Sequence, residues 1–191
     1  MSLNKLFLLS FSVLIILSSK VVATEDFLIK GNEYYQSYLE KQDSKDLENA
    51  YSNYYKEAQV RPSVSSFVGM GKVLIEQNNY PEAKKYLYRA YSIDKNDAIT
   101  NYYLAKFSFN NQEYLRALSF FLKAYQNGLA NNFDVNVQIA TIYEKVGDFE
   151  LAKKYYISAQ NLSKENDYFG NKIFNLDDME ANKIKYFNDW D

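Results

Sequence analysis

The chain has 191 residues, of which 47% are apolar and 17% aromatic, so it is long enough to bury a hydrophobic core. Cysteine and histidine are both absent, which excludes thiol nucleophiles, disulfides, Cys/His zinc sites and histidine-based catalytic triads. A formal net charge of −2, with no long basic run, argues against a nucleic-acid-binding protein.

Residues 1–23 have the three parts of a secretory signal peptide: a short basic start, an uncharged apolar run over residues 6–19, and a small residue, Ala23, suited to cleavage. We predict export, to a periplasm or by secretion, with Thr24 as the first residue of a mature chain of net charge −4. The apolar run is short for a membrane span, which needs about 20 residues, and Lys20 interrupts its far end. The alternative is that residues 6–19 stay uncleaved and anchor the domain to a membrane.

An alanine recurs along the chain with gaps of 33, 34 and 35 residues, and a large apolar residue follows each alanine by four, at Ala50, Ala83, Ala117 and Ala152. A period of about 34 residues is typical of stacked helix pairs, each of which buries its apolar face only against its neighbours. Scarce glycine and proline, with 19 tyrosines, also favour long helices. We therefore predict an all-α solenoid of antiparallel helix pairs over residues 24–166.

The first pair, residues 31–61, is a degenerate copy. Leu47 and Tyr54 fit the repeating pattern, but Tyr38 stands where a small residue belongs and Lys41 where an apolar one does. Terminal repeats are often atypical because one of their faces meets solvent.

Three clear pairs follow, beginning at Val64, Ala98 and Phe133. In the first of them, residues 67–74 place apolar side chains on one helical face, residues 77–81 form a polar break, and the second helix continues from Pro81. The other two pairs repeat this pattern, with turns at residues 110–112 and 146–148.

The repeated positions have steric roles. Small residues are predicted where the two helices of a pair approach closely, at Gly71, Ala105 and Ala140. Large ones are predicted to fill the space between repeats, at Leu87, Phe121 and Tyr156, and to plug the turn end of each pair, at Tyr80, Tyr114 and Phe149.

Residues 167–191 are predicted to form a capping helix that covers the last repeat. Asn175 is expected to cap its N-terminus. Its apolar residues fall on roughly one face: Leu176, Met179, Ile184, Phe187 and Trp190.

With these residues in place, the chain resembles the tetratricopeptide repeat family over residues 31–166. The family pattern Trp-x2-Leu-Gly-x2-Tyr followed by Ala-x3-Phe is matched best by Phe67-x2-Met70-Gly71-x2-Leu74 and Ala83-x3-Leu87. The chain departs from the pattern in that the closing proline occurs only as Pro62, and Asn101 and Asn136 replace the large first aromatic residue.

The resemblance implies a right-handed superhelix whose concave groove, lined by the first helix of each pair, holds an extended peptide or a partner helix. The matching partner-binding positions in this chain are Val68, Lys72, Ile75, Tyr102, Lys106, Phe109, Val137 and Thr141. Lys72 and Lys106 would be neighbours one repeat apart, and an apolar wall with two lysines suits a hydrophobic segment that carries a carboxylate. The alternative is that these are ordinary surface residues.

The sequence leaves three functions open. The first is an exported, non-catalytic scaffold for a protein or peptide partner. The second is a structural subunit of an envelope assembly that docks through its aromatic C-terminal helix, onto other proteins or onto copies of itself. The third is a carboxylate enzyme that uses Glu113 and Glu144, although the repeats build no evident pocket for it. No spacing indicates a catalytic, metal or cofactor site, and we predict none, nor a nucleic-acid partner.

Overall fold

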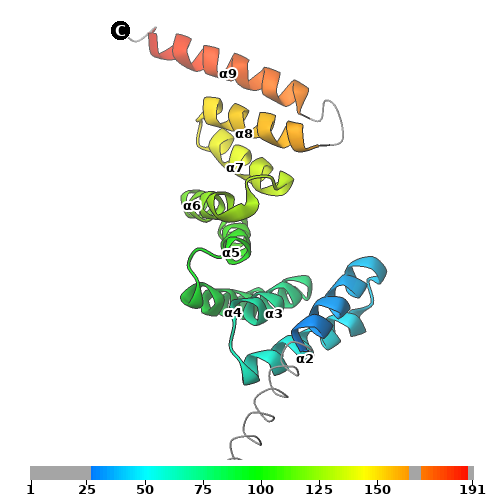
Figure 1. The fold of residues 1–191 in the computed structure, drawn as a ribbon. Coiled ribbons are helices and arrows are strands. Elements are labelled where there is room, and N and C mark those ends of the chain that lie inside the picture. The colour runs from blue at the N-terminus through cyan, green and yellow to red at the C-terminus, as the bar shows by residue number, and fades with distance from the viewer. Residues whose placement is uncertain (1–26, 164–168, 189–191) are drawn as a thin grey trace, which may run out of the picture. The chain divides into compact units, whose positions relative to one another are not determined.

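The structure is a computed structural model that describes residues 27–163 and 169–188 (Figure 1). Every regular element in these residues is helical, as the sequence predicts. The helices form two compact units, the first ending at Asp94 and the second beginning at Lys95. Among the described residues, no helix combines the length and the apolar character needed to cross a membrane. The predicted signal peptide or anchor lies outside the described residues.

Unit 1 contains the helical residues 27–41 and three further helices, α2 (Ser44–Val60), α3 (Val64–Glu76) and α4 (Tyr80–Ile93). The side chain of Asp43 accepts a hydrogen bond from the amide of Lys45 and caps α2. Ser63 caps α3 through a capping box, in which its side chain accepts from the backbone of Ser66 and the Ser66 side chain accepts in return. The helices begin where the repeat pattern predicts.

Unit 2 contains α5 (Ala98–Asn110), α6 (Tyr114–Ala124), a π-helical turn η1 (Tyr125–Leu129), α7 (Phe133–Lys145), α8 (Phe149–Leu162) and α9 (Gly170–Asn188). α5 packs against α6, and α7 against α8, as antiparallel pairs (Figure 1). α9 then packs against α8. The order reproduces the predicted sequence of helix pairs followed by a capping helix.

The turns inside the four helix pairs share a left-handed residue, and those of the three clear pairs also share their hydrogen bonds. One residue of each turn lies in the left-handed region, with φ of 58°, 58°, 61° and 80° at Gln42, Asn78, Gln112 and Gly147. In unit 1, Asn79 N donates to Leu74 O at 2.8 Å while Asn78 N donates to Ile75 O at 2.9 Å, and the same two bonds recur in both pairs of unit 2. These are Schellman caps, which satisfy the last carbonyls of the first helix and reverse the chain. The shared cap explains how polar turns of different sequence keep one repeat length.

The alanine positions are packing sites, as predicted. Ala50, Ala83, Ala117 and Ala152 are all fully buried. At Gly71, an added Cβ would lie 2.9 Å from the Leu87 side chain, which confirms that this column must be small where two helices meet.

Tyr54 shows how the degenerate first pair is held together. Its ring is buried between helical residues 27–41 and α3, where a Cβ added to Gly31 or Gly69 would lie 2.7 or 2.6 Å from the ring. Its hydroxyl donates to Asn32 Oδ1 at 2.8 Å. Two glycines therefore make room for one large ring, although Tyr38 occupies the usual small position.

Asn101 and Asn136, which depart from the family pattern, are buried clamps. The Asn101 side-chain amide donates to the backbone carbonyls of the residues six and four positions earlier, at 2.9 and 2.7 Å. Asn136 makes the same two bonds, each 2.8 Å. Each amide thus ties the loop before its helix to the first turn, a role that an aromatic side chain does not perform.

Two details of the sequence prediction are wrong. Tyr80 does not plug the turn end, because its side chain is 43% exposed and its hydroxyl donates to Asn78 Oδ1 at 3.0 Å. Asn175 does not cap the last helix, because α9 begins at Gly170 and Asn175 lies inside it. The predicted roles of Ile184 and Phe187 concern side chains that are not described, and Trp190 lies outside the described residues.

Candidate binding surface

In unit 1 the three predicted partner-binding residues lie on α3 and are largely covered. Val68 is only 7% exposed, and Ile75 is half-buried. The ammonium of Lys72 lies 4.0 Å from the centre of the Tyr35 ring, which belongs to the first helix. Burial lowers the pKa of Lys72, and the nearby Glu76 partly opposes this. Lys72 is therefore engaged within its own unit.

In unit 2 the predicted residues of α5 are more open. Lys106 is exposed, and its Nζ donates to the Tyr102 hydroxyl at 3.4 Å. The Tyr102 hydroxyl in turn donates to the Asp134 carboxylate on α7. Burial and this hydrogen bond raise the pKa of Tyr102, so the phenol stays protonated. Phe109 is half-buried against Tyr114, with ring centres 5.7 Å apart.

The two predicted residues of α7 lie one helical turn apart. Val137 and Thr141 are half-buried, and Thr141 Oγ1 donates to the Val137 carbonyl at 2.8 Å. Thr141 Oγ1 also lies 3.1 Å from the hydroxyl of Tyr156, a buried residue of α8. The Tyr102–Asp134 bond joins α5 to α7, so these five residues of unit 2 share one layer of helices.

Thr141 opens onto a pocket of about 420 Å³ at the meeting of α7, α8 and α9, lined by Thr141, Glu144, Lys145, Phe149, Lys172 and Met179. Glu144 is neutralised there, because its Oε2 lies 3.0 Å from Lys172 Nζ and accepts from the Tyr156 hydroxyl at 2.8 Å. Lys145 is exposed and pairs with no carboxylate among the described residues; its Nζ lies 5.4 Å from the centre of the Tyr114 ring. The pocket thus combines apolar walls with one uncompensated positive charge.

Sequence reasoning missed most of this pocket, although the repeat period contains the signal for it. Phe169, just before α9, and Ile173 and Leu176 within it pack in one cluster with buried residues of α8, and each stands 34 residues after a buried residue of α7. α9 therefore has the register of the first helix of a further pair. Extending the period by one unit makes Lys172 of α9 the counterpart of Gln138, the neighbour of the predicted groove residue Val137, and Lys172 lines the same pocket as Thr141.

The remaining predictions concern pairs of residues. Lys72 and Lys106 belong to different units, and their contact stays a prediction. For the enzymatic hypothesis, Glu113 is bound by Arg116 at 3.0 Å and Glu144 by Lys172, so each carboxylate has a basic partner of its own. No group of three or more carboxylates that could hold a metal ion occurs among the described residues.

Comparison with known proteins gives a match to a family profile and matches to solved structures. The sequence profile of the tetratricopeptide repeat matches residues 64–97 and 133–166, which are the first and third of the clear helix pairs. No curated protein matches the chain in sequence.

Similar solved structures support the fold. The pilF protein of Pseudomonas aeruginosa is 17% identical with a TM-score of 0.66, and the match covers 87% of this chain and 72% of that one. A MamA protein is 16% identical with a TM-score of 0.62, covering 87% and 88% of the two chains. A tetratricopeptide repeat protein from Parabacteroides merdae is 14% identical with a TM-score of 0.62, covering 84% and 61%. At these identities the likeness concerns the fold alone.

Proposed function

Because the chain belongs to the tetratricopeptide repeat family, we propose that it is an exported, non-catalytic scaffold that binds a peptide or partner protein through unit 2. Helical repeats of this kind serve as protein-interaction scaffolds, since stacked pairs leave an extended face free. The proposed binding face comprises Tyr102, Lys106, Val137, Thr141 and Lys145, together with the adjoining pocket.

The pattern of free positive charge on this face carries the proposal. Lys106 and Lys145 are exposed and form no ion pair among the described residues, whereas Asp134 and Glu144 are already engaged by Tyr102 and by Lys172. The apolar side chains of Phe149 and Met179 line the pocket beside Lys145. This combination suits a peptide segment with a bulky apolar side chain next to an acidic one or a free carboxylate.

Export is supported by the signal-peptide pattern of residues 1–23. Intact-mass measurement of the protein recovered outside the cytoplasm should find Thr24 as the first residue. Recovery of a membrane-bound chain that begins at Met1 would support the anchor, and a membrane-free chain that begins at Met1 would remove the export proposal.

The binding face is tested by charge reversal. Affinity capture from native envelope material, followed by mass spectrometry, identifies the main partner, whose affinity is then measured directly. Lys106→Glu combined with Lys145→Glu should weaken binding about tenfold or more, because both reversals oppose an acidic ligand. Lys154→Glu, an exposed lysine of α8 outside the binding face, is the matched control and should leave the affinity within about twofold. Equal affinities for the double variant and the control would contradict the proposed face.

A second candidate, a subunit that docks through α9, is favoured by Phe174. This residue is 66% exposed and stands 34 residues after Ala140, at a position where the three clear helix pairs carry a small, covered residue. Light scattering of Phe174→Ser separates the two functions. If α9 docks onto another copy, the variant loses the oligomer; if α9 is a simple cap, the molecular mass is the same for the variant and the unmodified chain.

A further inference from the structure

Unit 1 contains a buried carboxylate at a repeat position where the three clear pairs have alanine. Each clear pair has a second fully buried alanine seven residues after its first, namely Ala90, Ala124 and Ala159. In the degenerate first pair this position is Glu57, which is also 0% exposed. Packing does not require a glutamate here, because a methyl group is enough at the three equivalent positions.

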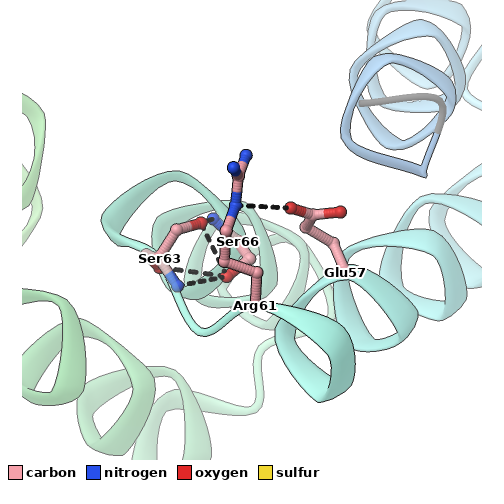
Figure 2. Close-up of polar contacts among 4 residues, drawn as sticks. All are labelled: Glu57, Arg61, Ser63 and Ser66. Atoms are coloured by element: carbon pink, nitrogen blue, oxygen red, sulfur yellow. Dashed lines mark hydrogen bonds and ion pairs between the residues drawn. The ribbon is translucent and has the colours of Figure 1, made fainter. Parts of the chain in front are cut away.

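The carboxylate of Glu57 is poorly compensated. Neither of its oxygens has a hydrogen-bond partner among the described residues. Arg61, four residues later, approaches it only to 3.8 Å, between Nε and Oε1, and the Arg61 side chain is 58% exposed. Ser63 and Ser66 lie beside this pair, but their hydroxyls bond to each other (Figure 2). A buried carboxylate without donors is costly when it is ionised and much less so when it is protonated.

Arg61 is the one described charge that acts on the Glu57 carboxyl. Burial raises the pKa of Glu57, and the positive charge of Arg61 lowers it only in part. The first turn of α3 is uncharged, and the two charged residues of this helix, Lys72 and Glu76, lie in its second half, where both contact Tyr35. The protonation of Glu57 is therefore governed mainly by burial.

The other charged side chains near this joint are exposed to solvent. Lys56, which precedes Glu57 on α2, is exposed. The charged residues of helical residues 27–41 are exposed too: Lys30, Glu33, Glu40 and Lys41. Exposed charges stay hydrated, and solvent screens them from a buried group. None of them alters the pKa of Glu57 as the charge of Arg61 does.

The first helix pair covers Lys72, a predicted groove residue of α3. The centre of the Tyr35 ring, in the first helix, lies 4.0 Å from Lys72 Nζ. Tyr54 joins α2 to the first helix, because its ring lies in close contact with Gly31. We therefore expect the pair to move as one body on α3, so that α2 cannot leave α3 at Glu57 without drawing Tyr35 away from Lys72.

We propose that Glu57 is a proton-operated latch between the first helix pair, residues 27–60, and α3. The protonated carboxyl is neutral and stays buried in the joint of α2 and α3. Loss of the proton places an uncompensated charge there, which favours conformations in which the joint opens and water reaches the carboxylate. Opening draws Tyr35 off α3 and exposes Lys72, so pH regulates access to the groove positions of unit 1. The inference goes beyond the binding face proposed in unit 2 and does not depend on export.

The test is the difference in Tm between the full chain and Glu57→Gln, followed from a pH of about 4 to a pH of about 8. Glutamine has the shape of a protonated glutamate but stays neutral at every pH. Across this range the difference should grow by roughly 3 °C in favour of the variant. Glu57→Ala, which restores the residue of the other pairs, should show the same growth and serves if the glutamine variant does not fold. Glu48→Gln, at an exposed position of α2, is the matched control, and its difference should change by less than about 1 °C.

The sign of the effect follows from linkage between protonation and folding. A glutamate has an ordinary pKa of about 4.3, and burial raises that of Glu57 in the folded chain, so the folded chain binds this proton more tightly than the unfolded one. The stability that the latch contributes is therefore complete below a pH of about 4 and is lost as the pH rises through the folded pKa. Arg61→Met removes the charge that lowers this pKa, so the growth measured between Arg61→Met and its double variant with Glu57→Gln should be larger.

A second measurement locates the opening. Lysines are acylated at a pH of about 8 with an amine-reactive ester, and the products are quantified by mass spectrometry. Lys72 should react about twofold faster or more in the unmodified chain than in Glu57→Gln, because opening of the joint uncovers it. Lys106, the exposed counterpart of Lys72 in unit 2, is the internal control and should react equally in both.

A Tm difference that stays constant with pH would overturn the latch. A difference that grows in favour of the unmodified chain would overturn it as well, since Arg61 would then hold the ionised carboxylate in the joint. Equal growth in Glu48→Gln would show a general effect of pH, and equal labelling of Lys72 in the two forms would show that Glu57 does not control the cover over α3. Either result would also remove the proposal.

Discussion

The joint between α2 and α3 in unit 1 and the joint between α6 and α7 in unit 2 occupy equivalent positions in the repeat but are built differently. In unit 2, Ala124 and Val135 are fully buried beside the apolar cluster around Phe121. In unit 1 the same two positions are Glu57 and Ser66, also fully buried. The same two repeat positions can therefore be apolar or polar, provided that the aromatic ring between the repeats, Tyr54 or Phe121, stays packed.

The difference teaches where each unit derives its stability. Phe121 packs among several branched side chains, such as Ile139 and Ile142, so its joint depends on summed apolar burial. Tyr54 instead depends on close approach to Gly31 and Gly69 and on one hydrogen bond to Asn32. Unit 1 is therefore expected to be sensitive to single atoms at its glycines.

The largest effect is expected for Gly69→Val. The first added carbon would lie 2.6 Å from ring atoms of Tyr54, whose other side is held by Gly31, so the ring cannot move away without a further clash. Overpacking of this kind costs about 3 kcal/mol of unfolding free energy. Urea unfolding followed by circular dichroism measures the loss.

The matched test of this clash is a second substitution. Tyr54→Leu destabilises the native chain but makes room for the valine, so the double variant should be more stable than the sum of the two single losses predicts. Additive losses would show that Gly69 is needed for another reason, such as its backbone conformation.

In unit 2 the expected sensitive point is a polar clamp. Asn136→Ala leaves the carbonyl of Ala130 without the amide that binds it, at a buried site, and should cost about 1–2 kcal/mol. Asn101→Ala should cost a similar amount, because Asn101 makes the same two bonds. Urea unfolding of both variants is the measurement. A neutral result for one and a loss for the other would mean that the two clamps are not equivalent.

Most of the fold could be predicted from the sequence because the repeat constrains it strongly. The spacing of Ala83, Ala117 and Ala152 sets the register, and each polar break then locates a turn to within a residue or two. The start of α9 could not be found in this way. Asn175 is a good capping residue, but tertiary packing of Phe169 and Ile173 on α8 extends the helix beyond it.

The candidate site was less predictable, because the family pattern gives the positions of the groove residues but not which neighbouring side chains cover them. Lys72 and Lys106 hold equivalent positions in the repeat, yet Tyr35 covers the first and the second is exposed. What covers a side chain depends on the neighbouring helix, and in the degenerate first pair that helix departs from the pattern. Glu57 was missed for the same reason, since a surface glutamate and a buried one look alike in a sequence.

The smallest effect is expected at the turns, where the two units share one geometry with different residues. Gln112 has φ of 61°, a conformation that costs a side chain with a Cβ but not glycine. Gln112→Gly should therefore stabilise the chain, by about 0.5 kcal/mol after allowance for the greater entropy of glycine in the unfolded state. Asn78→Gly in unit 1 should gain less, because asparagine tolerates this region better than glutamine. Urea unfolding of both variants, with Gly147→Ala as the reverse change, tests the order: if Gln112→Gly is destabilising, the glutamine side chain contributes something that its backbone conformation does not reveal.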